Sequence, residues 1–143
     1  MIDWDREWRA ARARSPLRMT VDNKDRWRDF WSGDARYYLQ NVRAEAPLYA
    51  MAVQRLSEEG WVREDDDVLD VGSGPGTFAL PLAPRVRSVT ALDEAEGMLE
   101  TLRQECAARG IGNVATVLRR WEDHPRQEGH DLVLASMNPA IAS

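Results

Sequence analysis

The chain has 143 residues, of which 43% are hydrophobic and 30% charged, so it is long enough for one globular domain with a buried core. Its formal net charge of −5 gives no overall attraction to nucleic acid, and no apolar run approaches the ~20 residues that a membrane-spanning helix needs. A single cysteine, Cys106, excludes an internal disulfide, and two histidines beside it argue against a structural zinc site.

Residues 1–60 are predicted to form a helical, tryptophan-rich segment. Two pairs of tryptophans stand four residues apart, which places each pair on one helical face: Trp4 with Trp8, and Trp27 with Trp31. One helix is expected from about Asp22 to Trp31, ended by Ser32 and Gly33.

A second helix is expected to have Pro47 in its first turn and to stop at Gly60. Its buried stripe would consist of Leu48, Met51, Ala52 and Leu56.

From about residue 61 to residue 143, short apolar runs alternate with helical patterns. The runs predict four strands, at residues 67–71, 86–92, 114–118 and 131–135. A short helix is expected from Thr77, and a longer one from about Ala95 to Arg109, with Gly110 as its end. This alternation predicts an α/β domain with a parallel sheet, right-handed crossovers and strands buried on both faces.

A glycine-rich turn follows the first predicted strand. Gly72, Gly74 and Gly76 leave it without side chains, so that a ligand can lie against bare backbone. Asp93 closes the second strand, where a carboxylate can accept hydrogen bonds from both hydroxyls of a ribose. The pattern favours a nucleoside-containing ligand over the alternative, a tight strand–helix turn with an incidental acid.

The spacing of the glycines in this turn distinguishes between two nucleoside-containing ligands, a nicotinamide dinucleotide and S-adenosylmethionine. A dinucleotide fingerprint would place its third glycine at position 77, where Thr77 stands, and here the third glycine comes one residue earlier. Asp70 precedes the first glycine by two residues, and its charge opposes a pyrophosphate but suits a cation. The electrostatics therefore favour S-adenosylmethionine, a sulfonium with an amino group, over a nicotinamide dinucleotide.

Residues 68–77, Val-Leu-Asp-Val-Gly-Ser-Gly-Pro-Gly-Thr, resemble motif I of the class I S-adenosylmethionine-dependent methyltransferases, and residues 91–93 resemble the acidic end of their second strand. The resemblance covers roughly residues 60–138. It implies a Rossmann-like domain that carries strands in the order 3-2-1-4 of a seven-stranded sheet, with strands 5–7 missing. It also implies that residues 1–60 fold over the cofactor as a lid.

The resemblance implies a role for each matching position. Asp70 would face the methionine amino group, the glycine turn would line the methionine and ribose, and Asp93 would hold the ribose hydroxyls. Glu94 replaces an apolar residue that is usual in the family, and Trp121 would either stack on the adenine or merely cover the sheet. The implied cofactor-binding residues are Asp70, Gly72, Ser73, Gly74, Pro75, Gly76, Asp93, Glu94, Trp121 and Glu122.

The end of the fourth strand resembles part of a motif of amino-methylating relatives. Asn138 and Pro139 match it, but Ala140 and Ile141 stand where a second proline and a stacking aromatic are usual. This argues against a nucleobase acceptor, and a simple Asn-Pro turn is the alternative reading. No catalytic residue can be assigned.

Two functions remain open from the sequence. The first is methyl transfer to an unidentified small-molecule or protein acceptor. The second is a non-catalytic module that binds S-adenosylmethionine or S-adenosylhomocysteine and pairs with another chain. Because the fourth strand would be an unpaired apolar edge, we expect a truncated domain, a homo-oligomer or a partner chain across that strand. The acidic N-terminal residues lack the apolar stretch of a signal peptide, so a cytoplasmic protein without membrane contact is expected.

Overall fold

A computed structural model describes residues 24–125 and 129–136 of the chain. The elements in chain order are α3 (Lys24–Glu58), β1 (Asp67–Val71), α4 (Ala79–Leu82), the 3-10 helix η1 (Ala83–Arg85), β2 (Ser88–Asp93), α5 (Glu96–Arg109), β3 (Val114–Leu118), the 3-10 helix η2 (Trp121–Asp123) and β4 (Leu132–Ala135). All four predicted strands are confirmed. The predicted end of α5 is also confirmed, because Gly110 adopts the left-handed conformation (φ 66°) that caps a helix.

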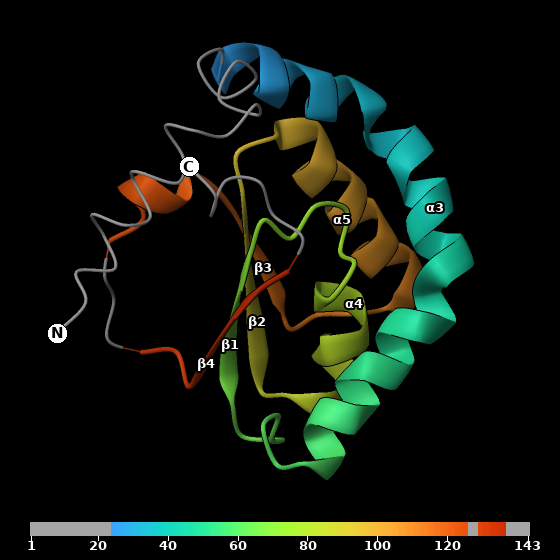
Figure 1. Cartoon of the computed structure of the whole chain (residues 1–143), viewed down its shortest axis with the longest axis vertical. Coiled ribbons are helices and arrows are strands. Elements are labelled where there is room, and N and C mark those ends of the chain that lie inside the picture. The colour runs from blue at the N-terminus through green and yellow to red at the C-terminus, as the bar shows by residue number, and fades with distance from the viewer. Residues whose placement is uncertain (1–23, 126–128, 137–143) are drawn as a thin grey trace, which may run out of the picture.

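The four strands form one parallel sheet in the order β3-β2-β1-β4, as predicted. The chain moves outward from β1 through β2 to β3 and then returns to place β4 on the other side of β1. The direction of winding therefore reverses at β1, and the carboxyl end of this strand is where an open parallel sheet binds its ligands. Figure 1 shows that α3, α4 and α5 all lie on one face of the sheet, with α3 as the outermost layer.

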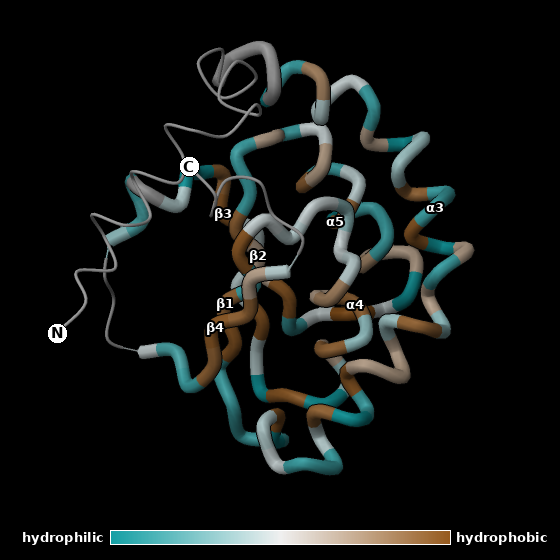
Figure 2. The backbone as a smooth tube through the Cα atoms, viewed as in Figure 1, coloured by the Kyte–Doolittle hydropathy of each residue, from teal (hydrophilic) through white to brown (hydrophobic). Residues whose placement is uncertain are grey.

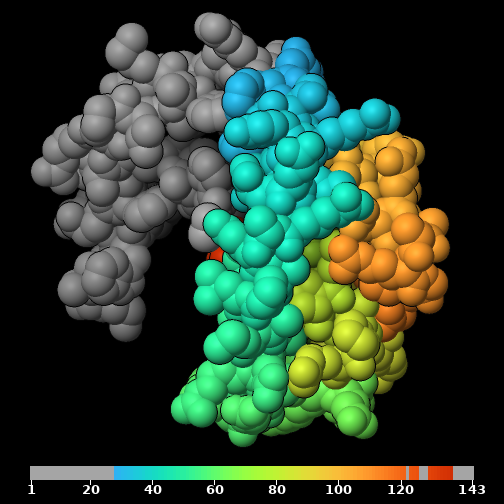
Figure 3. Space-filling view, turned by 90° about the vertical axis from the view of Figure 1, so that its right-hand side faces the viewer, coloured from blue at the N-terminus to red at the C-terminus, as the bar shows by residue number. Residues whose placement is uncertain are grey.

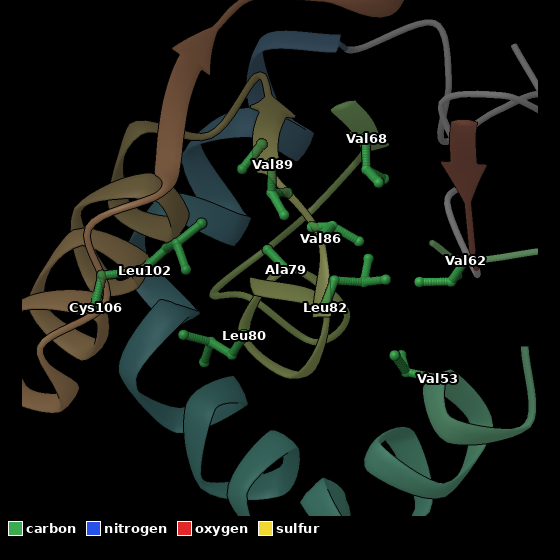
Figure 4. Close-up of a cluster of buried hydrophobic side chains, with 11 residues drawn as sticks. Val53, Val62, Val68, Ala79, Leu80, Leu82, Val86, Val89, Leu102 and Cys106 are labelled. Carbon is green, nitrogen blue, oxygen red and sulfur yellow. The ribbon is translucent and has the colours of Figure 1, made fainter. Parts of the chain in front are cut away.

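The main core lies between the sheet and these helices. Figure 4 shows side chains from β1, β2, α4, α5 and the C-terminal half of α3 converging on it. Its buried members are Val53, Val62, Val68, Ala79, Leu80, Leu82, Val86, Val89, Ala91, Leu102 and Cys106. Burial of these side chains, each contributing on the order of 1–3 kcal/mol, holds the helices against the sheet.

The expectation that every strand is buried on both faces is wrong for the outer strands. β1 buries four of its five residues and β2 three of its six, but β3 and β4 have only half-buried and exposed positions. Leu118 and Val133 are the large exposed residues. The reason is position, since β3 and β4 each have one neighbouring strand and the helices named above cover one face. Figure 2 shows that these strands are nevertheless hydrophobic.

The N-terminal segment differs from the expectation of two helices, because α3 is one continuous helix with Ser32, Gly33 and Pro47 in its interior. A Cβ atom on Gly97 of α5 would lie 2.1 Å from the carbonyl oxygen of Ser32, so the two backbones touch there. The packing of α3 against α5 at this point outweighs the low helix propensity of Ser32 and Gly33, which would otherwise end the helix.

The predicted buried stripe of this segment is wrong for two of its four residues, since Ala52 and Leu56 are half-buried and Leu56 packs against the main core. The buried residues of α3 are Ala35, Leu39, Val42, Tyr49 and Val53, whereas Leu48 and Met51 are exposed. The observed buried residues keep helical spacing on both sides of Pro47, from Ala35 to Val53. The proline therefore does not begin a second helix with a buried face of its own.

An ion-pair cluster with a buried carboxylate and two partly exposed arginines joins α3 to α5 at a second point. The Glu105 side chain of α5 is 8% exposed and binds Arg43 of α3 and Arg109 of its own helix. The Arg43 guanidinium is the main cause that lowers the pKa of the Glu105 carboxyl. Removal of either arginine would leave a buried carboxylate with one partner fewer, which is costly at a low dielectric.

The contact between Ser32 and Gly97 can be tested with two alanine substitutions. Gly97→Ala should destabilise the fold by about 1–3 kcal/mol, because its methyl group would press on the Ser32 carbonyl. Gly33→Ala is the matched control, since its Cβ would meet nothing within 4 Å in the interior of α3, and it should stabilise by up to about 1 kcal/mol. Urea unfolding measures both, and equal effects would show that α3 does not dock as described.

Candidate functional site

The turn after β1 has the glycine-dependent shape that the sequence predicted. Gly72, Gly74 and Gly76 have φ angles of 70°, 54° and 101°, which side-chain-bearing residues rarely adopt. The N–H groups of Gly72 and Ser73 both donate to the carbonyl oxygen of Leu92, at 2.7 and 3.1 Å. The turn is therefore anchored to the end of β2, and its backbone curls over the carboxyl edge of the sheet.

The glycines of this turn have different neighbours. A Cβ on Gly76 would lie 2.6 Å from Cδ1 of Leu102 and 2.7 Å from Cγ of Leu80, so this glycine permits the turn to pack on α5 and α4. A Cβ on Gly74 would meet only Cε1 of Tyr38, at 4.0 Å, among atoms within that distance. Gly74 therefore faces α3, and Tyr38 lies over the turn.

Asp93 joins the turn after β1 to the start of α5. Its Oδ2 accepts a hydrogen bond from the N–H of Gly74, and its Oδ1 accepts one from the N–H of Ala95, both at 2.9 Å. Burial raises the pKa of Asp93, although these backbone donors favour its ionised form. Each carboxylate oxygen has a second lone pair, so Asp93 can still accept hydrogen bonds from a ligand.

Asp70 is a buried acid below the same turn. It is 2% exposed, the Ala79 N–H donates to its carboxylate, and its Oδ2 has no hydrogen-bond partner among the described residues. Burial, and to a lesser extent the charge of Asp93, raises the pKa of Asp70 to about 7. The Ser73 hydroxyl, 3% exposed, also lacks a partner within the described part of the chain. Buried polar atoms normally have partners, so both atoms have free capacity for a hydrogen bond to a ligand or an ordered water.

Two aromatic residues of the segment predicted as a lid pack together beside the start of α5. Trp31 and Tyr38 of α3 meet edge-on, with ring centroids 5.5 Å apart, and pack on Ala95 and Met98 at the start of α5. Burial is the main cause that raises the pKa of Tyr38. Tyr37, however, is exposed and does not join this cluster. Trp4 and Trp8 lie outside the described residues, as does the side chain of Trp27.

The segment after β3 brings together residues that the sequence did not connect. Glu94 forms an ion pair with Arg120, with Nε and Oε2 3.1 Å apart, so its carboxylate already has a cationic partner. Trp121 is 40% exposed and stacks on His124, with centroids 6.3 Å apart and planes 17° from parallel. The stacking that the sequence left open for Trp121 thus involves a protein ring.

Both ring nitrogens of His124 are buried without a partner among the described residues, and burial lowers the pKa of this imidazole. No signal in the sequence marked His124 or Arg120. The side chain of Glu122 lies outside the described residues, as do Asn138 and Pro139.

Two searches of the described residues bear on the class of protein. They contain no group of three or more histidine, cysteine or acidic side chains arranged to hold a metal ion. Within them, α3 is the longest helix, and no helix is both long and apolar enough to cross a membrane.

Comparison with known proteins gives the family. A family model described as a methyltransferase domain matches residues 68–142. An uncharacterized protein of Haemophilus influenzae is 39% identical over 115 residues, which are 78% of this chain and 41% of that protein.

Two solved structures share the fold. A putative S-adenosyl-L-methionine-dependent methyltransferase from Methanococcus maripaludis matches with a TM-score of 0.66 and 21% identity over 73% of this chain and 49% of its own. Coclaurine N-methyltransferase bound to N-methylheliamine and SAH matches with a TM-score of 0.52 and 28% identity over 60% of this chain and 26% of its own. The chain spans less than half the length of each of these three relatives.

The burial of Asp70 predicts how stability depends on pH. Between about pH 4 and 7 the folded protein holds a proton on Asp70 that the unfolded chain has released, so the free energy of unfolding should fall as the pH rises through this window. The slope for one such group is at most about 1.4 kcal/mol per pH unit. Asp70→Asn keeps the shape and removes the titration, so it should flatten the profile.

Urea unfolding of wild type and Asp70→Asn at a series of pH values from about 4 to about 8 measures how the free energy of unfolding depends on pH. This range brackets roughly the pKa of Asp70 in the unfolded chain and in the folded protein. Parallel profiles for the two proteins would contradict the burial of an ionisable Asp70.

Proposed function

The chain belongs to the methyltransferase-domain family, and we propose that it binds S-adenosylmethionine at the turn after β1 and presents its methyl group to a small-molecule or protein acceptor. The observation that carries this proposal is the buried Oδ2 of Asp70, which lies beneath a turn of bare backbone and has no hydrogen-bond partner among the described residues. S-adenosylmethionine supplies a methyl group on a sulfonium, which is already a good leaving group.

Asp70 has the chemistry to receive the amino end of this ligand. Burial and the charge of Asp93 raise the pKa of the Asp70 carboxyl. A cation placed beside this carboxyl would lower its pKa and stabilise the ionised form. A phosphate at this position would raise the same pKa further. The charges of Asp70 and Asp93 therefore support a phosphate-free cationic ligand over a dinucleotide.

Asp93 would hold the ribose while keeping the turn in shape. Its oxygens accept hydrogen bonds from the N–H groups of Gly74 and Ala95, and the Glu94 backbone also bonds the carboxylate, which leaves acceptor capacity for a ligand hydroxyl. Glu94 follows Asp93 directly, but its pairing with Arg120 supports a role in fixing the segment after β3 more than a direct contact.

The adenine would lie beside η2. Trp121 offers a partly exposed aromatic face, and the nitrogens of His124, which have no partner in the described part of the chain, are suited to hydrogen bonding. Glu122 remains a predicted contact on the same 3-10 helix.

Tyr38 supports a closing role for α3. Its ring lies over Gly74, and the docking of α3 on α5 holds it there. A methyl transfer mainly requires that donor and acceptor be aligned and that water be excluded, and an aromatic ring over the turn serves the second requirement.

The proposal is tested by calorimetric titration of S-adenosylmethionine and S-adenosylhomocysteine into wild type and Asp93→Ala. Loss of the carboxylate should weaken both ligands at least about tenfold, equivalent to roughly 1.4 kcal/mol. Glu100→Gln, an exposed acid of α5, is the matched control and should bind as wild type does.

Unchanged affinity of Asp93→Ala, with its fold verified by circular dichroism, would refute the proposed site. Tight binding of NAD to the wild type would instead favour a dehydrogenase. Binding of the cofactor without methyl release to any acceptor or partner would favour a non-catalytic module.

The closing role of Tyr38 makes a separate prediction. Tyr38→Phe keeps the ring over Gly74 and should leave affinity for S-adenosylhomocysteine nearly unchanged, whereas Tyr38→Ala removes it and should weaken binding several-fold. Equal affinities of the alanine and phenylalanine variants would show that the ring does not cover the ligand.

A further inference from the structure

α3 carries a second apolar stripe, on the side opposite its buried face. Phe30, Tyr37, Ala44 and Met51 follow one another at intervals of seven residues, and Leu48 lies one turn after Ala44. Phe30, Tyr37, Leu48 and Met51 are 52%, 64%, 62% and 67% exposed. We call these five residues the outer stripe.

The outer stripe extends along the surface of the molecule. From Phe30 to Met51 it spans about 32 Å of helix. In Figure 3 α3 runs along the face turned toward the viewer, over the other described elements. An apolar repeat of seven residues on an exposed helix is the pattern by which helices pair side by side.

We propose that the outer stripe is an interface between two copies of this chain, in which their α3 helices pack antiparallel about a two-fold axis. In this register Tyr37 of each copy faces Leu48 of the other, because the two-fold axis lies midway between these two positions rather than at the centre of the whole stripe. The axis passes between Asn41 and Ala44, two small exposed residues that let the helices approach closely.

Charge selects the antiparallel direction. Asp34 and Arg55 lie four residues after Phe30 and Met51, so they flank the outer stripe near its two ends. Antiparallel packing brings Asp34 of one copy within about one helical turn of Arg55 of the other, twice per dimer. Parallel packing in register would place Asp34 against Asp34 and Arg55 against Arg55. Arg55 already pairs with two acids, Glu58 of α3 at 3.8 Å and Glu59 just after the helix at 2.8 Å, and its guanidinium has donors for a further carboxylate.

The size of the stripe predicts a reversible dimer. Four large side chains from each copy form a short seam, which falls in the small class of interfaces, below about 1,200 Å². The dimer should therefore dissociate on dilution. It leaves the turn after β1 free, because Tyr38 and the buried face of α3 point the other way, so it is independent of the proposed function.

Sedimentation velocity over a concentration series tests the interface through charge reversal. Asp34→Arg and Arg55→Asp, each alone, should raise the dissociation constant about tenfold or more, since each brings like charges together. The double variant restores opposite charges and should recover most of the wild-type affinity. Leu48→Glu should abolish the dimer and leave cofactor binding unchanged.

Val133→Glu on β4 is the control for association through the open edge of the sheet, the alternative predicted from the sequence. It should leave the dimer intact. A monomeric wild type at every concentration, a double variant that fails to recover, or a dimer that is lost only with Val133→Glu would each overturn the proposal.

Discussion

The two hydrogen bonds of the Asp93 carboxylate hold the functional end of this molecule together. One fixes Gly74 in the turn after β1, and the other fixes Ala95 at the start of α5. The position of α5 in turn determines where Gly97 meets Ser32, and hence where α3 runs. Together with the ion pair of Arg43 and Glu105, these contacts bring Tyr38 to Gly74. A single carboxylate therefore sets the shape of the turn and, through α5, the place of the helix that covers it.

The site places two acids where both resist ionisation. Asp70 and Asp93 are raised in pKa chiefly by burial, and the charge of Asp93 adds to the effect on Asp70. Such an arrangement opposes the stability of the free fold at neutral pH and is relieved by a cation. The fold and its proposed ligand are thus matched in charge, which the overall charge of −5 would not reveal.

The sheet and the glycine turn could be predicted from the sequence because their signals are local. An apolar run such as residues 67–71 is bounded by its own turn residues, and Gly110 ends α5 by its own conformation. The path of α3 could not be predicted, because the contact that keeps Gly33 helical comes from Gly97, far along the chain. Likewise the position of Asp70 was evident, but its unpartnered oxygen depends on packing from several elements. The pairing of Glu94 with Arg120 and the stacking of His124 on Trp121 had no sequence signal.

The single thiol of the chain has a consequence for studying its motions. Cys106 lies in the main core on α5, and burial raises its pKa, so it reacts slowly with alkylating reagents while the core is closed. Because no second cysteine competes, the rate of labelling would report how often α5 separates from the sheet. Labelling of this one thiol would therefore measure how fast α5 opens, and α5 is the helix against which the turn after β1 packs.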